Sequence, residues 1–305
     1  MKLYLAPMEA LTGYIFRNVY NRYFGDADRY FTPFIASRKL NSKEKNDVLP
    51  EHNQNMDVIP QILTNKSEEF CYIASRLKEY YGYEEVNLNL GCPSGTVVAK
   101  NRGSGFLAVP DELNRFFEEV FSRTDVRISV KTRTGVENNE NWENILKIYN
   151  DYPISELIIH PRCRKDGYGG KPNLEDFKKA VLISRHSLCY NGDINSVEDY
   201  NAITKEFPTV DKIMCGRGIL MNLGLFSEIK GSRKASPETL YNFANDLYKG
   251  YKEIMSGDRN VLFKLKEFWI YFSKNFEEPD KVLKMVRKAD TCIQYEVAVG
   301  RIFGI

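Results

Sequence analysis

The sequence lacks the patterns that mark metal-binding, disulfide-bonded and membrane proteins. Its six cysteines are scattered among 305 residues without a C-x-x-C pair, which argues against a zinc site or a disulfide framework and for a reducing cytosol. No apolar run approaches the ~20 residues that span a bilayer. Glu9 interrupts the first apolar stretch too early for a signal peptide. We therefore expect a soluble cytoplasmic protein with no metal and no membrane partner.

The sequence also has little net charge. It holds 43 lysines and arginines against 41 aspartates and glutamates, a net charge of +2. An acidic partner would therefore have to meet a local basic patch. The hydrophobic and charged fractions, 43% and 28%, are ordinary for a globular protein, and the chain is long enough for one large domain plus an appendage.

Short apolar segments alternate with amphipathic helical segments through the first three-quarters of the chain. The pattern predicts strands at 3–7, 29–35, 57–63, 85–90, 127–132, 156–160, 187–191 and 211–216. It predicts a helix at 67–81 with Ser67 as N-cap. Eight strands, most followed by a helix, favour an α/β fold of the closed (β/α)8 TIM-barrel type, which takes ~250 residues. An open doubly wound sheet is the alternative, but no G-x-G-x-x-G turn follows the first strand to bind a dinucleotide.

The strand pattern stops near residues 231–234. Ser236 and Pro237 then have the signature of a helix start, and two more helices are predicted at roughly 258–276 and 280–300. We expect two domains: a catalytic barrel at 1–230 and an all-helical domain at 236–305.

Polar side chains collect at the predicted strand ends, where the carboxyl ends of barrel strands build the active site. The ends carry Pro7, Met8, Gln61, Asn89, Cys92, Lys131, Arg133, His160, Asn191, Gly192, Asp193, Gly216 and Arg217. The turns at 191–193 and 216–218 follow the last two strands, where such barrels bind phosphate through backbone amides and a nearby cation. Cys92 stands between a glycine and a proline, and the turn alone leaves open whether it is a small packing residue or a thiol offered to the site.

Six segments, in this order and spacing, resemble the dihydrouridine synthases, flavoenzymes that reduce uridine in RNA. They are APM at 6–8, NLGCPSGTVVAKNRGSGFL at 89–107, VKTRTG at 130–135, IIHPRCRKDGYGG at 158–170, NGDI at 191–194 and CGRG at 215–218. The resemblance implies that FMN is held by Pro7, Met8, Glu9, Gln61, Lys131, His160, Asn191, Gly192, Asp193, Gly216 and Arg217. It implies uracil held by Asn89, Arg133 and Tyr168, Cys92 as the acid, NADPH as reductant, and tRNA or another structured RNA as partner of a monomeric enzyme.

Reduction of the C5–C6 bond of uracil is consistent with an acid at position 92. The reaction needs a hydride at C6 and a proton at C5, and a thiol with an ordinary pKa of ~8.5 is mostly protonated at neutral pH. A nucleophilic cysteine would instead want a neighbouring base. Lys131 can stabilise the negative charge that develops. We expect Cys71, Cys189 and Cys215, within apolar segments, to serve packing.

The sequence departs from the family pattern at four positions. Gly13 stands where an aspartate usually follows the threonine, Pro161 and Cys163 replace a usual glycine and threonine, and Ala108 stands where an arginine is common. These departures bear on how the RNA is held. We expect the RNA to follow a basic track of Lys100, Arg102, Arg162, Arg164, Lys165, Lys284, Arg287 and Lys288.

Three alternatives remain open at this level. One is a small-molecule FMN oxidoreductase of the dihydroorotate dehydrogenase type, which would share the phosphate turns and the lysine but would not need the cationic helical tail. The others are a catalytically silent RNA-binding module that keeps flavin for stability, and a phosphate-binding isomerase on the same barrel.

Overall fold

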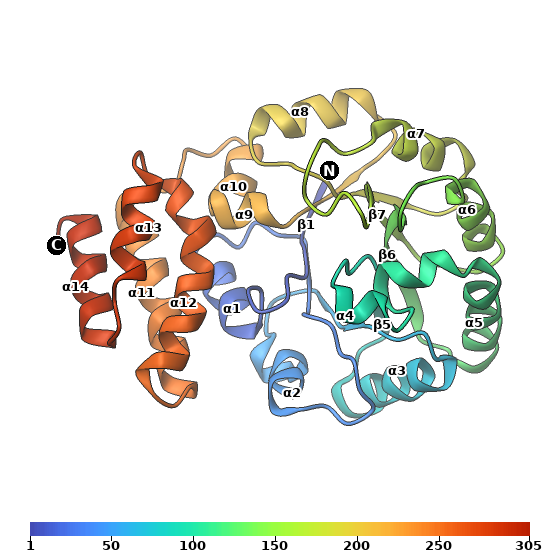
Figure 1. The fold of residues 1–305 in the computed structure, drawn as a ribbon, viewed down its shortest axis with the longest axis horizontal. Coiled ribbons are helices and arrows are strands. Elements are labelled where there is room, and N and C mark those ends of the chain that lie inside the picture. Colours follow the sequence, from blue (N-terminus) through green and yellow to red (C-terminus); the bar gives the residue numbers. More distant parts are fainter.

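The computed structural model describes residues 1–305, and its centre is a closed barrel of parallel strands (Figure 1). The strands are β1 (Lys2–Leu5), β2 (Arg29–Phe31), β3 (Val58–Ile59), β4 (Gln61–Ile62), β5 (Glu85–Leu90), β6 (Arg127–Gly135), β7 (Leu157–Cys163), β8 (Leu188–Tyr190) and β9 (Lys212–Cys215). They pair in the order β3-β2-β1-β9-β8-β7-β6-β5-β4. Only Pro60 separates β3 from β4, so the two ends of this order adjoin and the sheet closes. The predicted TIM barrel is confirmed, and the open sheet is excluded.

Pro60 explains why one predicted strand becomes two. Proline has no N–H to donate, so the strand predicted at 57–63 is interrupted there, although the Pro60 carbonyl still accepts a bond from Asn87 N at 2.8 Å. On the other side of the barrel, β1 pairs with β9 so that Leu5 lies opposite Cys215. This pairing brings the loop after the first strand next to the loop after the last.

Helices surround the barrel, as Figure 1 shows. They are α1 (Tyr14–Tyr23), α2 (Ser42–Val48), α3 (Ser67–Tyr81), α4 (Gly95–Val98), α5 (Pro110–Arg123), α6 (Trp142–Asn150), α7 (Leu174–Ile183), α8 (Val197–Glu206), α9 (Arg217–Met221) and α10 (Leu225–Ile229), with 3-10 turns at Pro50–His52 and Gly103–Ala108. The prediction of Ser67 as N-cap of α3 is wrong. Lys66 occupies that position, and the Ser67 hydroxyl bonds Glu119 of α5 instead.

Four helices form the tail: α11 (Pro237–Ile254), α12 (Asp258–Phe272), α13 (Pro279–Arg287) and α14 (Cys292–Phe303), with a 3-10 turn at Ser273–Asn275. The Ser236 hydroxyl accepts a bond from Thr239 N at 3.1 Å, so the predicted cap of α11 is confirmed. The single helix predicted at 280–300 is wrong. Helix α13 ends at Arg287, and Thr291 caps the start of α14, where its hydroxyl accepts a hydrogen bond from Gln294 N at 3.2 Å.

The tail shares its apolar core with the barrel. The Phe16 ring of α1 lies 5.7 Å from the ring of Phe243 in α11 and 6.1 Å from that of Phe268 in α12. Gly250 of α11 also lies directly against α1, because a Cβ at this position would come within 2.7 Å of the Ile15 side chain. This packing places α11 and α12 against α1 (Figure 1). None of the helices combines the length and apolar character needed to cross a bilayer.

Candidate active site

Two adjoining hollows open at the carboxyl ends of the barrel strands. Both are lined by Pro7, Met8, Lys131, His160 and Tyr168. The first, here called the arginine hollow, continues along residues 191–195 and 214–218. The second, the thiol hollow, is completed by Glu9, Leu11, Pro33, Phe34, Gln61, Asn89, Gly91, Cys92, Pro93, Arg133 and Tyr271. All fifteen residues predicted for the site line one hollow or the other, and their individual roles stay predictions.

The turn that carries Cys92 is fixed from both sides. The Asn89 side-chain oxygen accepts bonds from Gly91 N at 3.0 Å and Cys92 N at 2.9 Å. The Cys92 carbonyl accepts from the backbone N–H of Ser104 at 3.1 Å and from its hydroxyl at 2.8 Å. Gly103 lies in the left-handed region, with φ 56°, and a Cβ there would lie 2.9 Å from the Cys92 Cβ. The backbone that carries the thiol is therefore fixed at the wall of the thiol hollow.

Burial keeps the Cys92 thiol protonated. Desolvation raises the pKa of Cys92, and the nearby Glu9 carboxylate raises it further, against the cations Lys131 and Arg133. Because the charged thiolate is the form that loses solvation, the neutral thiol dominates at physiological pH. A protonated thiol can donate a proton and is a poor nucleophile.

A chain of side-chain amides crosses the bottom of the thiol hollow. Asn89 Nδ2 donates to Gln61 Oε1 at 2.7 Å, and Gln61 Nε2 donates to Asn87 Oδ1 at 2.7 Å. The Asn89 oxygen already accepts two backbone bonds, and one of its two N–H groups is bound to Gln61. Asn89 therefore has a single N–H left for a ligand. Gln61 keeps one N–H and one oxygen lone pair. Asn89 and Gln61, both predicted to contact a ligand, can therefore offer it only these remaining hydrogen bonds.

Lys131 is a cation without a partner. It projects from β6 into both hollows, and no carboxylate forms a salt bridge with it. Burial, and then the positive charge of Arg133, lowers the pKa of Lys131 to about 8. Lys131 is thus charged at neutral pH in a place where nothing balances its charge, which favours an anionic ligand.

His160 is neutral and its tautomer is fixed by its neighbour. Arg162 Nη1 lies 3.2 Å from His160 Nε2, and because a guanidinium can only donate, Nε2 must accept and Nδ1 carries the proton. Burial holds the pKa of His160 well below its usual range, and the surrounding cations, Lys131 foremost, lower it further. His160 therefore offers the site one neutral N–H donor.

The Asp193 carboxylate forms ion pairs with two arginines. Its carboxylate accepts from Arg162 Nη1 at 3.0 Å and from Arg217 Nη2 at 2.6 Å. Burial opposes ionisation, but the bond and charge of Arg162, together with Arg217, lower the pKa of Asp193. Asp193 thus orients Arg217, which also lies under the Tyr168 ring with 4.2 Å between Cζ and the ring centroid.

Arg162 is no part of an RNA track. It is buried, and besides Asp193 it donates to the carbonyls of Gly169 at 3.1 Å and Gly170 at 2.5 Å. It ties the loop after β7 to the turn after β8. The expectation that Arg162 contacts RNA is therefore wrong. The sequence could not show this, because the carbonyls and the carboxylate that bind Arg162 come together only in the folded chain.

The glycines at the ends of β8 and β9 are closely packed by their neighbours. A Cβ at Gly218 would lie 1.9 Å from the Ile194 carbonyl, and one at Gly216 would lie 3.3 Å from the Met8 sulfur. Asn191 Nδ2 donates to the Met214 carbonyl at 2.8 Å and joins the two strand ends. Bare backbone beside Arg217 therefore forms the wall of the arginine hollow, a surface suited to a phosphate.

Arg133, predicted to hold the substrate, also organises the site. Its guanidinium donates to the carbonyls of Gly91 at 3.0 Å, Cys163 at 2.9 Å and Gly167 at 3.0 Å. Three of its five N–H groups are thus committed, and it joins the Cys92 turn to the loop after β7. Tyr168 on that loop is 54% exposed, so its ring is accessible to a ligand.

Glu9, predicted as a cofactor contact, lies at the edge of the thiol hollow. It is exposed and forms an ion pair with Lys43 of α2. The structure therefore places it next to the site but gives it a partner within the chain.

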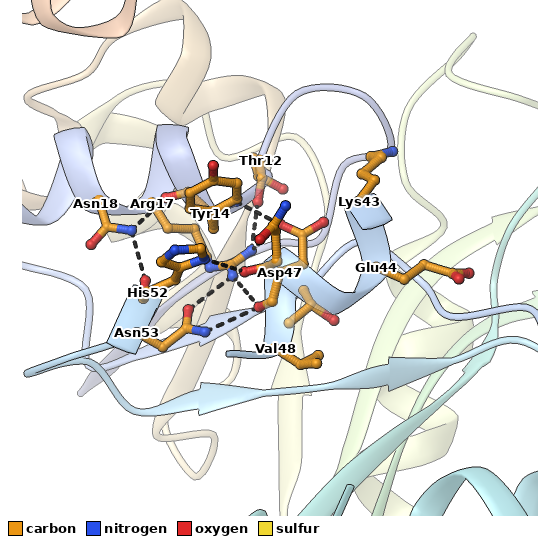
Figure 2. A network of polar contacts seen from close by, with 12 residues as sticks. Thr12, Tyr14, Arg17, Asn18, Lys43, Glu44, Asp47, Val48, His52 and Asn53 are labelled. Atoms are coloured by element: carbon orange, nitrogen blue, oxygen red, sulfur yellow. Dashed lines mark hydrogen bonds and ion pairs between the residues drawn. The ribbon is translucent and has the colours of Figure 1, made fainter. Parts of the chain in front are cut away.

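A buried ion pair that the sequence did not reveal positions the loop after β1. Arg17 of α1 donates to the Thr12 carbonyl at 3.0 Å and the Asp47 carbonyl at 2.6 Å, and its Nη1 lies 3.4 Å from the Asp47 carboxylate. The same carboxylate accepts from Tyr14 N at 2.6 Å. Figure 2 shows these side chains converging between α1 and α2. The signal was an arginine within the otherwise apolar face of α1, whose partner is 30 residues away.

Comparison with known proteins identifies the family. The model of the dihydrouridine synthase (Dus) family matches residues 4–289. The chain belongs to the dihydrouridine synthase family. It is 28% identical over 227 residues to tRNA-dihydrouridine synthase B of Pasteurella multocida (strain Pm70), covering 74% of this chain and 68% of that protein.

Two further similarities extend the comparison. The chain is 24% identical to the tRNA-dihydrouridine(16) synthase of Aquipseudomonas alcaligenes over 316 residues, 96% of each chain. Among solved structures, morphinone reductase superposes with a TM-score of 0.54 at 12% identity, covering 78% of this chain and 88% of that one. At that identity the likeness concerns the barrel fold alone.

Proposed function

We propose that this dihydrouridine synthase reduces the C5–C6 double bond of uridine in tRNA to 5,6-dihydrouridine, with FMN as cofactor and NADPH as reductant. The observation that carries the proposal is the pairing of a protonated thiol, Cys92, with an unbalanced cation, Lys131, in one hollow of the barrel mouth. The named relatives, which are tRNA-dihydrouridine synthases, support tRNA as the substrate.

The residues present fit FMN. The arginine hollow offers side-chain-free turns at Gly192 and Gly216, and Arg217 stands beside them for a phosphate. Lys131 and His160 line both hollows, so both would contact a flavin ring that reaches from one hollow into the other. One phosphate site of this kind suits a mononucleotide rather than FAD. When bound, FMN supplies the hydride that reaches C6 of the base.

The chain's own residues supply the rest of the reaction. Cys92 donates its proton to C5, which its raised pKa and fixed turn allow. Lys131 stabilises the negative charge that develops as the double bond is reduced. The remaining N–H of Asn89, the free donors of Arg133 and the ring of Tyr168 hold the uracil in the thiol hollow.

Release of the cofactor tests the proposal. The purified protein is expected to be yellow, and denaturation should free one FMN per chain, identified by absorption and mass. A protein that is colourless and stays inactive on tRNA after FMN is added would contradict it.

A further inference from the structure

One side chain of the helical tail reaches the thiol hollow. Tyr271, in the last turn of α12, lines this hollow together with Asn89, Cys92 and Tyr168. It is half-buried, and its hydroxyl makes no hydrogen bond within the chain. Burial raises the pKa of Tyr271, and the proximity of Tyr168 raises it further. A tyrosine thus stands at the site with its ring on the wall and its hydroxyl unused.

The position of Tyr271 is fixed by the rest of α12. Lys264, seven residues earlier and therefore on the same face of the helix, donates to the Ala10 carbonyl at 3.0 Å. Ala10 belongs to the loop that carries Pro7 and Met8 into both hollows. Phe268 packs on Phe16 of α1 on the core side of α12. The helix is thereby anchored to the barrel mouth at the level of Tyr271.

An aromatic side chain in this place suits a nucleotide. Enzymes that modify a base must take it out of the stack, and they hold it between aromatic or apolar side chains. Three aromatic side chains line the thiol hollow: Phe34, Tyr168 from the loop after β7, and Tyr271 from the tail. The two tyrosines come from separate parts of the chain, and both are partly accessible to a ligand.

We infer that Tyr271 is a substrate-binding residue, whose ring packs against the flipped-out uridine beside Cys92. The inference rests on the proposed function and deepens it. It gives the tail a part in forming the base pocket, since removal of α12 would leave the thiol hollow without this wall.

Three variants test the inference. Tyr271→Leu removes the ring, and Tyr271→Phe keeps it. Tyr80→Leu is the matched control, because Tyr80 is an exposed tyrosine in the last turn of α3, stacked under Arg76, at the end of the barrel opposite the site. Dihydrouridine formation is measured against tRNA concentration, alongside FMN content and NADPH oxidation without tRNA.

Tyr271→Leu is expected to raise the KM for tRNA on the order of tenfold or more, the usual effect of losing a base-stacking ring. Its FMN content and NADPH oxidation should match wild type. Tyr271→Phe should stay close to wild type in all three measurements, as should Tyr80→Leu.

Three results would overturn the inference: a Leu variant with wild-type KM, a Phe variant as impaired as the Leu variant, or a Leu variant that loses FMN and NADPH oxidation together with tRNA activity. If the wild-type protein itself forms no dihydrouridine in tRNA, the proposed function fails, and the inference fails with it. Wild-type activity with an unaffected Leu variant removes the inference alone.

Discussion

Burial sets the protonation of three titratable side chains at the barrel mouth. It raises the pKa of Cys92 and lowers those of Lys131 and His160, because in each case the charged form loses solvation. At neutral pH the two hollows therefore contain a neutral thiol, a neutral imidazole and one ammonium group. The guanidinium groups of Arg133 and Arg217 add further positive charge, so the site offers both a proton donor and cations to the reduction of an electron-poor double bond.

Cys92→Ala should separate the two halves of the reaction. The variant is expected to bind FMN and to oxidise NADPH normally, while dihydrouridine formation in tRNA falls by about 10²–10⁴-fold, the usual effect of losing one positioned acid. Cys71→Ala, on α3, is the control and should retain full activity. Near-normal turnover of tRNA by the Cys92 variant would assign the acid elsewhere.

Lys131 should reduce the stability of the cofactor-free protein. Its pKa is about 8 in the folded chain against an ordinary 10.5, so between these pH values the unfolded chain binds more protons and the free energy of unfolding rises with pH. Lys131→Met is expected to raise the free energy of unfolding at pH 7 by roughly 1–3 kcal/mol and to have little effect near pH 10.5.

Urea unfolding of the cofactor-free protein at the two pH values checks this, with the exposed Lys165→Met as control. The Met variant should also bind FMN more weakly. A Met variant that is less stable than wild type at pH 7 would show that Lys131 has a stabilising partner that the structure does not contain.

At the scale of the element, α1 begins on a cap supplied by another helix. Gly13 has no side chain to cap α1, and the Asp47 carboxylate of α2 accepts from Tyr14 N instead. A Cβ at position 13 would lie 3.3 Å from that carboxylate. The departure at Gly13, where the family usually has an aspartate, is thus accompanied by a carboxylate from α2 at nearly the same place, beside Arg17.

Because the Asp47 carboxylate takes the place of a side chain at position 13, the effects of substitutions at positions 13 and 47 on stability should be coupled. Asp47→Ala should destabilise the protein by about 3–5 kcal/mol, because it leaves buried Arg17 without a counter-ion. Gly13→Asp alone should also destabilise, since two carboxylates would meet. The double variant should recover part of the loss, as a double-mutant cycle in urea would reveal. Strictly additive changes in the free energy of unfolding would contradict the idea that Asp47 takes the place of a side chain at position 13. Asp125→Ala, at an exposed pair with Lys78, is the control and should have little effect.

The elements also show what the sequence could and could not predict. All eight predicted strands are present, because each is an apolar run between turn signals. The break between α13 and α14 was predictable, since Thr291 and Gln294 have the spacing of a capping box. The partner of Ser67 was not, because Glu119 is 52 residues away. The site residues were found by their place at strand ends, whereas the commitment of Asn89 and Arg133 to backbone groups emerged only from the fold.

Over the whole molecule, the predicted RNA track separates into free and committed cations. Arg162 is buried, Arg102 forms a salt bridge with Glu69, and Arg164 forms one with Glu137. The exposed members without a salt bridge are Lys100, Lys165, Lys284, Arg287 and Lys288. Free positive charge is therefore found in the loops after β5 and β7 and toward the end of α13, a tail helix that Figure 1 labels.

Charge reversal at the end of α13 should weaken RNA binding. Arg287→Glu combined with Lys288→Glu is expected to lower tRNA affinity and to reduce the slope of log affinity against log salt by about 0.7–0.9 per lost phosphate contact. FMN content and NADPH oxidation should not change. Lys178→Glu with Lys205→Glu, two exposed cations of α7 and α8, makes the same change in net charge and should leave the slope intact. Equal slopes for the two double variants would remove the tail from the interface.

The most direct measurement is mass spectrometry of nucleosides from dihydrouridine-free tRNA after incubation with the purified protein, FMN and NADPH. We expect a uridine that gains two hydrogen atoms, and we expect free uridine to react poorly, because binding energy from the rest of the RNA positions the base. Unchanged tRNA together with brisk reduction of a free pyrimidine would contradict the account and place the protein among small-molecule flavin oxidoreductases.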